Sequence, residues 1–123
     1  MKILFYTTQS DPIAEQFHNV IAMFSWKYQV DLYRTPESLK HRLCRPSNDL
    51  DIVVLIAANH EELLQIHSLG DLLSDLRIVL ILPDRKPGTI SKAHALGPRF
   101  LTYIDSDSEE LKSVLNKMLE NQN

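Results

Sequence analysis

Ile52-Val53-Val54-Leu55-Ile56-Ala57 is a continuous apolar run near the middle of this 123-residue chain. The run has neither helical spacing nor the apolar–polar alternation of a strand with one solvent-exposed face. It therefore predicts a strand that is buried on both faces. Ile3 to Thr7 and Ile78 to Leu82 have the same character. Strands of this kind favour a parallel sheet that is covered by helices on each side.

Two weaker runs alternate between apolar and polar residues, which is typical of strands with less cover. They are Gln29 to Arg34, with Val30 and Leu32 on one side, and Arg99 to Ile104. We expect both strands near the edges of the sheet.

Helix start signals stand between the strand-like runs. Asp11 and Thr35 each precede a proline, which is the pattern of an N-cap followed by proline at the first helical position. The apolar stripe expected on the first helix is Ile13, Phe17, Val20, Ile21 and Phe24, and the second helix carries Leu39 and Leu43 before Pro46 ends it.

Three further helices follow in the second half of the chain. Asn59 with Glu62 has the spacing of a capping box, and Gly70 favours a stop for the helix that begins there. Thr89 opens a short helix that ends at Gly97-Pro98, and Ser106 with Glu109, or Asp107 with Glu110, caps the last one. The residues expected to face the sheet are Leu63, Leu64, Ile66 and Leu69 in the third helix, and Leu111, Val114, Leu115 and Met118 in the last.

This order of five strand-helix units predicts an α/β fold, a doubly wound five-stranded parallel sheet with helices on both faces. The layout is that of flavodoxin-like folds, whose strand order is 2-1-3-4-5 and whose ligand crevice lies at the carboxyl ends of strands one and three. We expect one domain over residues 1–120 and a frayed tail at 121–123.

Composition and charge exclude several classes of protein. Hydrophobic residues make up 44% and charged residues 24%, as in folded domains, and the net charge of −3 leaves no positive excess for nucleic acid. The longest apolar stretch, Ile52 to Ala58, is far shorter than the roughly 20 residues that cross a bilayer. Cys44 is the only cysteine; we expect it to be a half-buried apolar residue, and a single thiol fits a reducing compartment. We therefore expect a cytoplasmic protein that binds neither nucleic acid nor membrane.

Three segments resemble the receiver domains of response regulators. Asp51-Ile52-Val53-Val54-Leu55-Ile56 is similar to the third receiver strand, and Ala93 to Tyr103 resembles the stretch of small residues, Leu-Gly-Ala and aromatic-Leu that precedes the receiver lysine. With Lys2 to Tyr6, the resemblance covers nearly the whole chain. It implies a CheY-like fold.

The resemblance also implies where a phosphorylation site would lie, and this chain departs from the receiver pattern at each position. Receivers hold Mg²⁺ on an acidic pair after the first strand, accept phosphoryl on an aspartate that ends the third, and end the fourth and fifth strands with a hydroxyl residue and a lysine. The corresponding residues here are Thr7 and Thr8, Ile56 (or Ala57 if the register slips by one), Leu82 or Pro83, and Tyr103. Only the aromatic switch position is filled, by Phe100.

Phosphoryl transfer to a carboxylate needs a nucleophilic oxygen, a divalent cation and a further positive charge. Isoleucine and alanine supply no nucleophile. We therefore predict a pseudo-receiver that is not an enzyme, needs no cofactor, and acts in signalling or regulation by protein–protein contact, as a docking platform or a dimer. The family's usual partner surface, the fourth helix, fifth strand and fifth helix, would here present Lys92, His94, Arg99, Thr102, Tyr103 and Lys112.

The polar residues at the strand ends also fit a ligand site. Thr7 to Asp11 and Asn59 to Glu62 would line a small-ligand crevice, although helix starts require the same residue types. Side chains just beyond the strand ends could converge on a metal, but their spacing is not that of metal ligands, and we predict no metal site. They are Asp11, His60, Glu61 and Asp84.

The alternative from another class is a flavin or nucleotide binder. Tyr6 to Asp11 puts hydroxyls and a helix N-terminus where flavodoxins hold a phosphate. The loop contains no glycine, however, and Asp11 would place a negative charge beside the anion. Trp26 and Tyr28, the aromatic residues that could cover a flavin ring, belong to the opposite edge of the predicted sheet.

Overall fold

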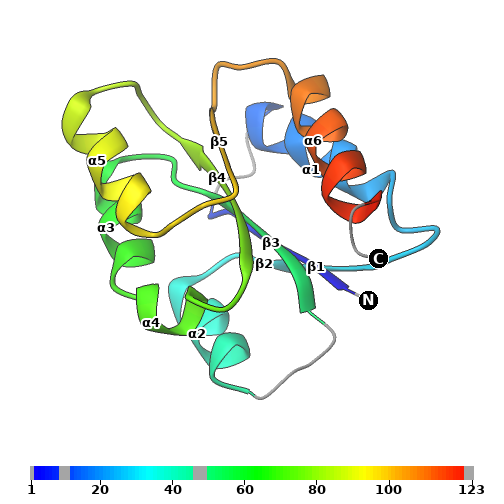
Figure 1. Ribbon diagram of the computed structural model, residues 1–123, viewed down its shortest axis with the longest axis horizontal. Helices are drawn as coiled ribbons and strands as arrows, with labels where there is room; N and C mark the ends of the chain where they lie inside the picture. The colour runs from blue at the N-terminus through cyan, green and yellow to red at the C-terminus, as the bar shows by residue number, and fades with distance from the viewer. Residues whose placement is uncertain (1, 9–11, 46–49, 121–123) are drawn as a thin grey trace.

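The predicted strands form one parallel sheet in a computed structural model, which describes residues 2–8, 12–45 and 50–120 (Figure 1). The strands are β1 (Lys2–Tyr6), β2 (Gln29–Tyr33), β3 (Leu50–Ile56), β4 (Arg77–Leu82) and β5 (Phe100–Tyr103). Their order is β2-β1-β3-β4-β5, and each neighbouring pair is parallel. The expected order 2-1-3-4-5 is confirmed, and the two weaker runs are indeed the edge strands.

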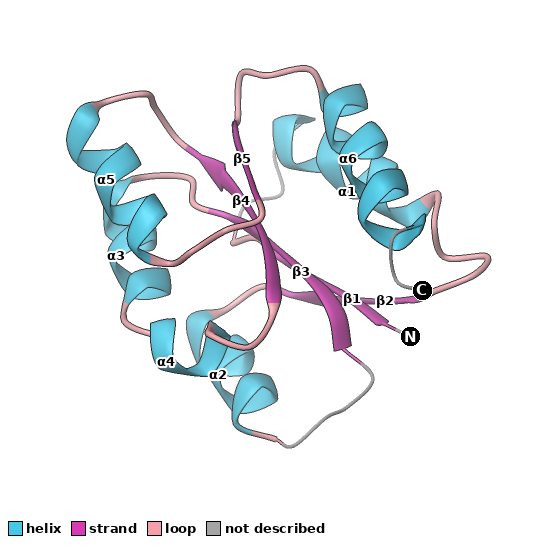
Figure 2. Ribbon diagram, viewed as in Figure 1, coloured by secondary structure: helices cyan, strands magenta, loops and turns pink. Residues whose placement is uncertain are grey.

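Helices cover both faces of this sheet (Figure 1, Figure 2). They are α1 (Pro12–Ala22), α2 (Pro36–Cys44), α3 (His60–His67), α4 (Gly70–Leu73), α5 (Pro87–Ala95) and α6 (Ser108–Glu120). Helices α1 and α6 lie side by side on one face, and α2, α3, α4 and α5 lie on the other. None of the helices in the described ranges is long and apolar enough to span a bilayer.

Side chains 52–57, in and just after the central strand β3, alternate between two cores, which explains why this stretch is apolar. Ile52, Val54 and Ile56 join the core beneath α1 and α6. Val53, Leu55 and Ala57 join the core on the opposite face. Successive side chains of a strand point to opposite faces, so a strand covered on both sides has no position for a polar residue.

The structure contains one helix more than the sequence predicts. Gly70 does not end a helix but begins the short α4, after α3 has ended at His67. Leu69 and Leu73 are both buried in the core on the face that α2, α3, α4 and α5 cover, and the additional helical turn brings them against the sheet. The local pattern around an isolated glycine predicts a stop because it carries no information about this packing.

Two residues expected on the buried helix faces are exposed. Ile13 in α1 is 42% exposed and Leu64 in α3 is 43% exposed. In α1 the buried position is taken by Ala14, and in α3 the buried residues include Leu63 and Ile66. Each helix is rotated slightly from the phase we expected, because a short helix with several apolar residues admits more than one buried stripe.

Helix caps agree with the sequence at most described positions. The Thr35 hydroxyl accepts from the Ser38 N–H in a capping box, and the Asn59 side chain accepts from the Glu62 N–H at 2.9 Å. Asp107, the second of the two expected caps of the last helix, accepts from the Glu109 N–H at 3.0 Å. Asp11 and Pro46 lie outside the described residues.

Two local expectations are wrong. Helix α5 begins at Pro87 rather than at Thr89, which is buried inside it; proline at the first helical position has its φ already set for a helix. Cys44 is exposed rather than half-buried, because Leu39 and Arg42 form the buried face of α2 and its last residue points away from them.

Candidate functional site

The carboxyl ends of β1 and β3 carry the residues that we expect, from the resemblance to receivers, at the cation and phosphate-acceptor positions. Thr7 is buried, and its N–H donates to the Tyr33 carbonyl at 3.1 Å. Ile56 is 3% exposed in the core beneath α1 and α6, and Ala57 is fully buried in the other core. At this edge of the central strand the side chains are therefore hydrocarbon.

Thr8 is hydrogen-bonded to the buried carboxylate of Glu62. From the sequence, Glu62 is expected only to help begin a helix. The Thr8 hydroxyl donates to Glu62 Oε2 at 2.7 Å, and the Ala58 N–H donates to Glu62 Oε1 at 3.3 Å. Glu62 thus links the loop after β1 to the loop after β3. Glu62 is the third residue of α3, the position at which a capping-box side chain would accept from the N–H of the N-cap Asn59. Its carboxylate instead accepts from the N–H of Ala58, the residue before the N-cap.

Tyr6 lies beside this carboxylate at the end of β1. Its ring is buried in the core on the face that α2, α3, α4 and α5 cover. Burial, together with the negative charges of Glu62 and Glu37, raises the pKa of the Tyr6 phenol to about 12. The phenol is therefore neutral at physiological pH.

The ends of β4 and β5 lie next to each other, with Leu82 opposite Tyr103 in the ladder. Leu82 is fully buried, and Pro83 and Tyr103 are half-buried. Phe100, which we expect at the aromatic switch position, is opposite Val79 and packs against the core beneath α1 and α6.

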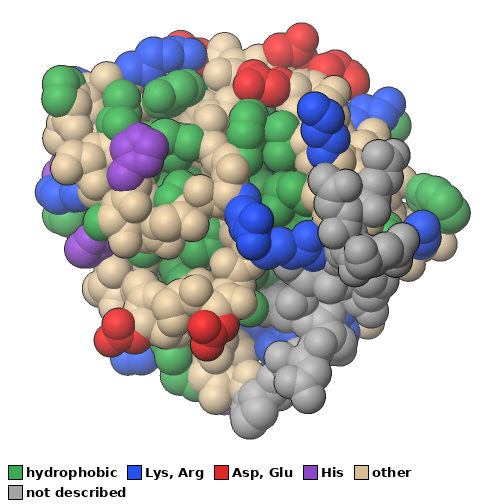
Figure 3. Space-filling view, in the orientation of Figure 1, with side chains coloured by type: hydrophobic (Ala, Val, Ile, Leu, Met, Phe, Trp, Pro, Cys, Tyr) green, Lys and Arg blue, Asp and Glu red, His purple; other side chains and the backbone are tan. Residues whose placement is uncertain are grey.

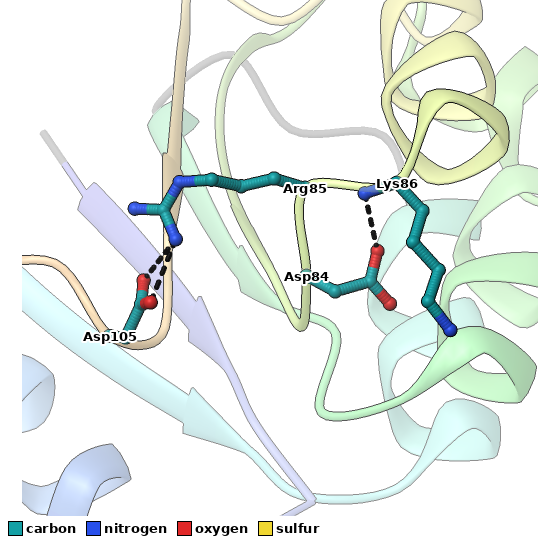
Figure 4. A network of polar contacts seen from close by, with 4 residues as sticks. All are labelled: Asp84, Arg85, Lys86 and Asp105. Atoms are coloured by element: carbon teal, nitrogen blue, oxygen red, sulfur yellow. Dashed lines mark hydrogen bonds and ion pairs between the residues drawn. The ribbon is translucent and has the colours of Figure 1, made fainter.

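Arg85 covers Tyr103. The guanidinium carbon lies 4.1 Å from the centre of the Tyr103 ring. One guanidinium nitrogen is 2.8 and 2.7 Å from the two carboxylate oxygens of Asp105 (Figure 4). The hydrogen bond from Arg85 holds the pKa of the Asp105 carboxyl below its ordinary value. The positive charge of Arg85, in the turn over residues 83–88, is thus engaged by an anion of the same chain.

A second carboxylate in the same turn is used by the backbone. Asp84 Oδ1 accepts from the Lys86 N–H at 2.9 Å, directly before α5 begins (Figure 4). The pKa of Asp84 is lowered by this bond and by a hydrogen bond from the Thr89 side chain. Asp84 therefore stabilises the start of α5.

The described candidate metal ligands, His60, Glu61 and Asp84, do not form a three-residue site. Among the residues that the structure describes, no three His, Cys, Asp or Glu side chains form a group that could hold an ion. The ammonium of Lys92 lies 3.1 Å from His60 Nε2, so a cation already stands beside that imidazole. Asp11 lies outside the described ranges.

The six residues expected to form the partner surface are not all available to a partner. Thr102 is 3% exposed, because α6 covers the face of β5 to which it points, and the expectation that it is available to a partner is wrong. Lys112 lies on α6 beside Trp26, on the α1 side of the molecule. Lys92 and His94 lie on α5, and Arg99 is exposed just before β5.

The likeness of this chain to known proteins is one of structure alone. No protein-family model matches the chain, and no curated protein matches it in sequence. A response regulator receiver protein from Pseudoalteromonas atlantica superposes with a TM-score of 0.77 at 10% identity, with 100% of both chains covered. The chain has the receiver fold.

Other solved structures share this fold. A response regulator from Thermotoga maritima has a TM-score of 0.71 at 12% identity, covering 98% of this chain and 99% of its own. A pilus assembly-related protein from Burkholderia pseudomallei has a TM-score of 0.70 at 19% identity, covering 98% and 90%. The expected CheY-like, flavodoxin-like architecture is confirmed.

Proposed function

We propose that this chain is a receiver-like regulatory module that works without phosphorylation, through contact with another protein. The observation that carries the proposal is the buried hydrocarbon of Ile56 and Ala57 at the end of β3. A receiver needs a carboxylate oxygen at this point to attack the phosphoryl group. Neither residue offers one in either register of the strand.

The surrounding positions support the same conclusion. Thr7 and Thr8 replace carboxylates, the hard oxygen ligands that Mg²⁺ requires, and the Thr8 hydroxyl is already engaged by Glu62. At the end of β5, a receiver's ammonium would offset charge on the phosphoryl oxygens. Tyr103 stands there instead, beneath a guanidinium that is paired with Asp105.

The neighbours' names are compatible with a role defined by contact. The receiver fold occurs in proteins named as response regulators and in two Burkholderia proteins named for pilus assembly. We propose that the partner of this chain docks on the exposed part of the α5 and β5 region, around His94 and Arg99. Thr102 and Lys112 have no part in this surface.

Treatment with a phosphodonor tests the first half of the proposal. The intact chain is incubated with acetyl phosphate and Mg²⁺, or with beryllofluoride and Mg²⁺, beside a phosphorylatable receiver as the positive control. We expect no phosphoryl adduct in the intact mass and no change in the amide spectrum of this chain. A stable adduct on an aspartate would refute the proposal.

Capture of a partner tests the second half. The wild-type chain and the double variant His94→Glu/Arg99→Glu are compared as bait, and Lys117→Glu, at an exposed position of α6, is the control charge change. We expect the double variant alone to lose a partner that the other two retain. Equal capture by all three baits would show that the α5 and β5 region is not the docking surface.

The flavin alternative is tested with the same preparation. A flavodoxin-like binder would quench flavin mononucleotide fluorescence on titration. We expect no quenching, because the loop after β1 has no glycine with which to wrap a phosphate.

A further inference from the structure

A hollow of about 320 Å³ lies at the edge of the molecule opposite the strand ends discussed above. It is formed by the turn between α1 and β2, together with Lys112, Asn116 and Leu119 of α6. Its floor is apolar and buried, and includes Phe24, Tyr28 and Leu119. The hollow is large enough to receive a side chain from another molecule.

Two large apolar side chains at this hollow remain in solvent. Trp26 is 81% exposed and Met23 is 51% exposed. An exposed tryptophan beside an apolar floor is unusual on a monomeric surface, and tryptophan is among the residues that most often anchor protein interfaces. The two side chains extend the apolar floor outward into a wider contact surface.

The charge of the hollow is opposite to that of the chain. Lys27 and Lys112 line it, and no aspartate or glutamate is among its described lining residues, although the net charge of the chain is −3. The Lys27 ammonium lies 5.6 Å from the centre of the Tyr28 ring, so it is held close to the apolar floor. Hydrophobic and basic side chains adjoin at the margin of Figure 3 where Figure 1 draws this turn.

We propose that this hollow docks a segment of a protein partner that inserts one large apolar side chain and carries carboxylates beside it. The apolar side chain would pack between Trp26 and the floor, and the carboxylates would meet Lys27 and Lys112. Such a segment is complementary to the hollow in both shape and charge. This surface is separate from the α5 and β5 region and goes beyond the function proposed above.

A protein segment fits the hollow better than a membrane does. Lipid-binding basic clusters usually contain about four to eight lysines or arginines. Among the described residues that line this hollow, only Lys27 and Lys112 are basic. A bilayer also presents a broad surface, which would contact the rim and leave the concave floor empty.

The test uses a display library of short random peptides, selected on the immobilised full chain. We expect the selected peptides to share a large apolar residue flanked by aspartate or glutamate. Trp26 is the only tryptophan, so its emission should shift to the blue as each peptide binds. By calorimetry, we expect Trp26→Ala and the double variant Lys27→Glu/Lys112→Glu each to weaken binding by roughly tenfold or more.

The matched control is Lys117→Glu, which changes an exposed charge on the same helix outside the hollow and should leave peptide affinity unchanged. Circular dichroism checks that each variant is folded, which is expected because the substituted side chains lie at the surface. These variants should also retain any partner that depends on His94 and Arg99. The proposal for the hollow and the proposal for the α5 and β5 region can therefore be refuted independently.

Three results would overturn the proposal. The first is a set of selected peptides without acidic residues, or peptides that bind Trp26→Ala as tightly as the wild type. The second is a shift of Trp26 emission on adding phosphatidylserine–phosphatidylcholine vesicles when no peptide binds. The third is a dimer in sedimentation that Trp26→Ala dissociates, which would mean that a second copy covers the hollow.

Discussion

The guanidinium of Arg85 lies over the ring of Tyr103, 4.1 Å from its centre, and is paired with Asp105 just beyond the strand end. This contact fastens the turn between β4 and α5 to the end of β5. The resemblance to receivers leads us to expect a lysine where Tyr103 stands. Here the strand end is engaged in a contact within the chain instead.

Replacing Arg85 should loosen the turn without unfolding the protein. Arg85→Ala removes the cation over Tyr103 and the ion pair with Asp105, both near solvent, where such contacts contribute little to stability. We expect amide hydrogen exchange to accelerate around Asp84 and Lys86, while the urea midpoint changes little. Arg99→Ala, another exposed arginine, should leave that exchange unchanged.

The same contact predicts a pH dependence at Asp105. Because its pKa is lowered in the folded protein, the stabilisation is present above the ordinary pKa of an unfolded aspartate and is lost as pH falls through the lower folded value. A carboxyl-carbon NMR titration should place the Asp105 midpoint below 3.8. In Arg85→Ala the midpoint should rise toward 3.8; an unchanged midpoint would contradict the pairing.

The phenol of Tyr6 should ionise only in strongly alkaline solution. Its pKa of about 12 means that the folded state favours the neutral phenol, so this stabilisation is complete below pH 10 and is lost as pH rises toward 12. Ultraviolet difference absorption should show this late step in the wild type, which has four tyrosines. The step should be missing in Tyr6→Phe, and its persistence there would assign it to another tyrosine.

Glu62 should matter for stability although it stands in a helix start. In Glu62→Ala the Ala58 N–H and the Thr8 hydroxyl, both partly buried, lose this acceptor, and an unsatisfied buried group costs about 1–3 kcal/mol. Urea unfolding measures this loss. Glu61→Ala is the matched control, since the adjacent Glu61 is exposed and its removal should change stability by less than about 0.5 kcal/mol.

Neighbouring leucines in α3 test the orientation of that helix. Leu63 is fully buried and Leu64 is 43% exposed. We expect Leu63→Ala to lower the free energy of unfolding by about 2–5 kcal/mol, because it leaves a cavity in the core. Leu64→Ala should cost far less. Equal losses would mean that α3 is rotated toward the phase that the sequence pattern indicates.

The central strands show what can be predicted from the sequence. In the run over residues 52–57, the side chains that point to each face of the sheet are all apolar, so both faces must be covered. The structure has a core on each side of this run. The N-caps at Thr35 and Asn59 are predictable in the same way, because a cap depends only on residues within one turn. The likeness to receivers in the third and fifth strands indicates the same architecture.

The errors lie where burial depends on a distant element. Thr102 follows the alternation of an edge strand, yet it is buried because α6 crosses that face of β5. Ile13 and Leu64 belong to apolar stripes wide enough to be rotated either way. Lys112, which the family resemblance places on the expected partner surface, lines the hollow beside the turn after α1, and this placement depends on how α6 packs.

The amino-acid sequence alone determined the order of the strands, the helices other than α4, and the hydrocarbon at the end of β3, because these depend on residue types and local periodicity. Tertiary structure alone decided that Arg85 meets Asp105, 20 residues away, and that Trp26 stands beside Lys112 over an apolar floor. The physical reason is range. Backbone preferences act within a few residues, whereas contacts between separate elements arise only when the helices have packed against the sheet and excluded water.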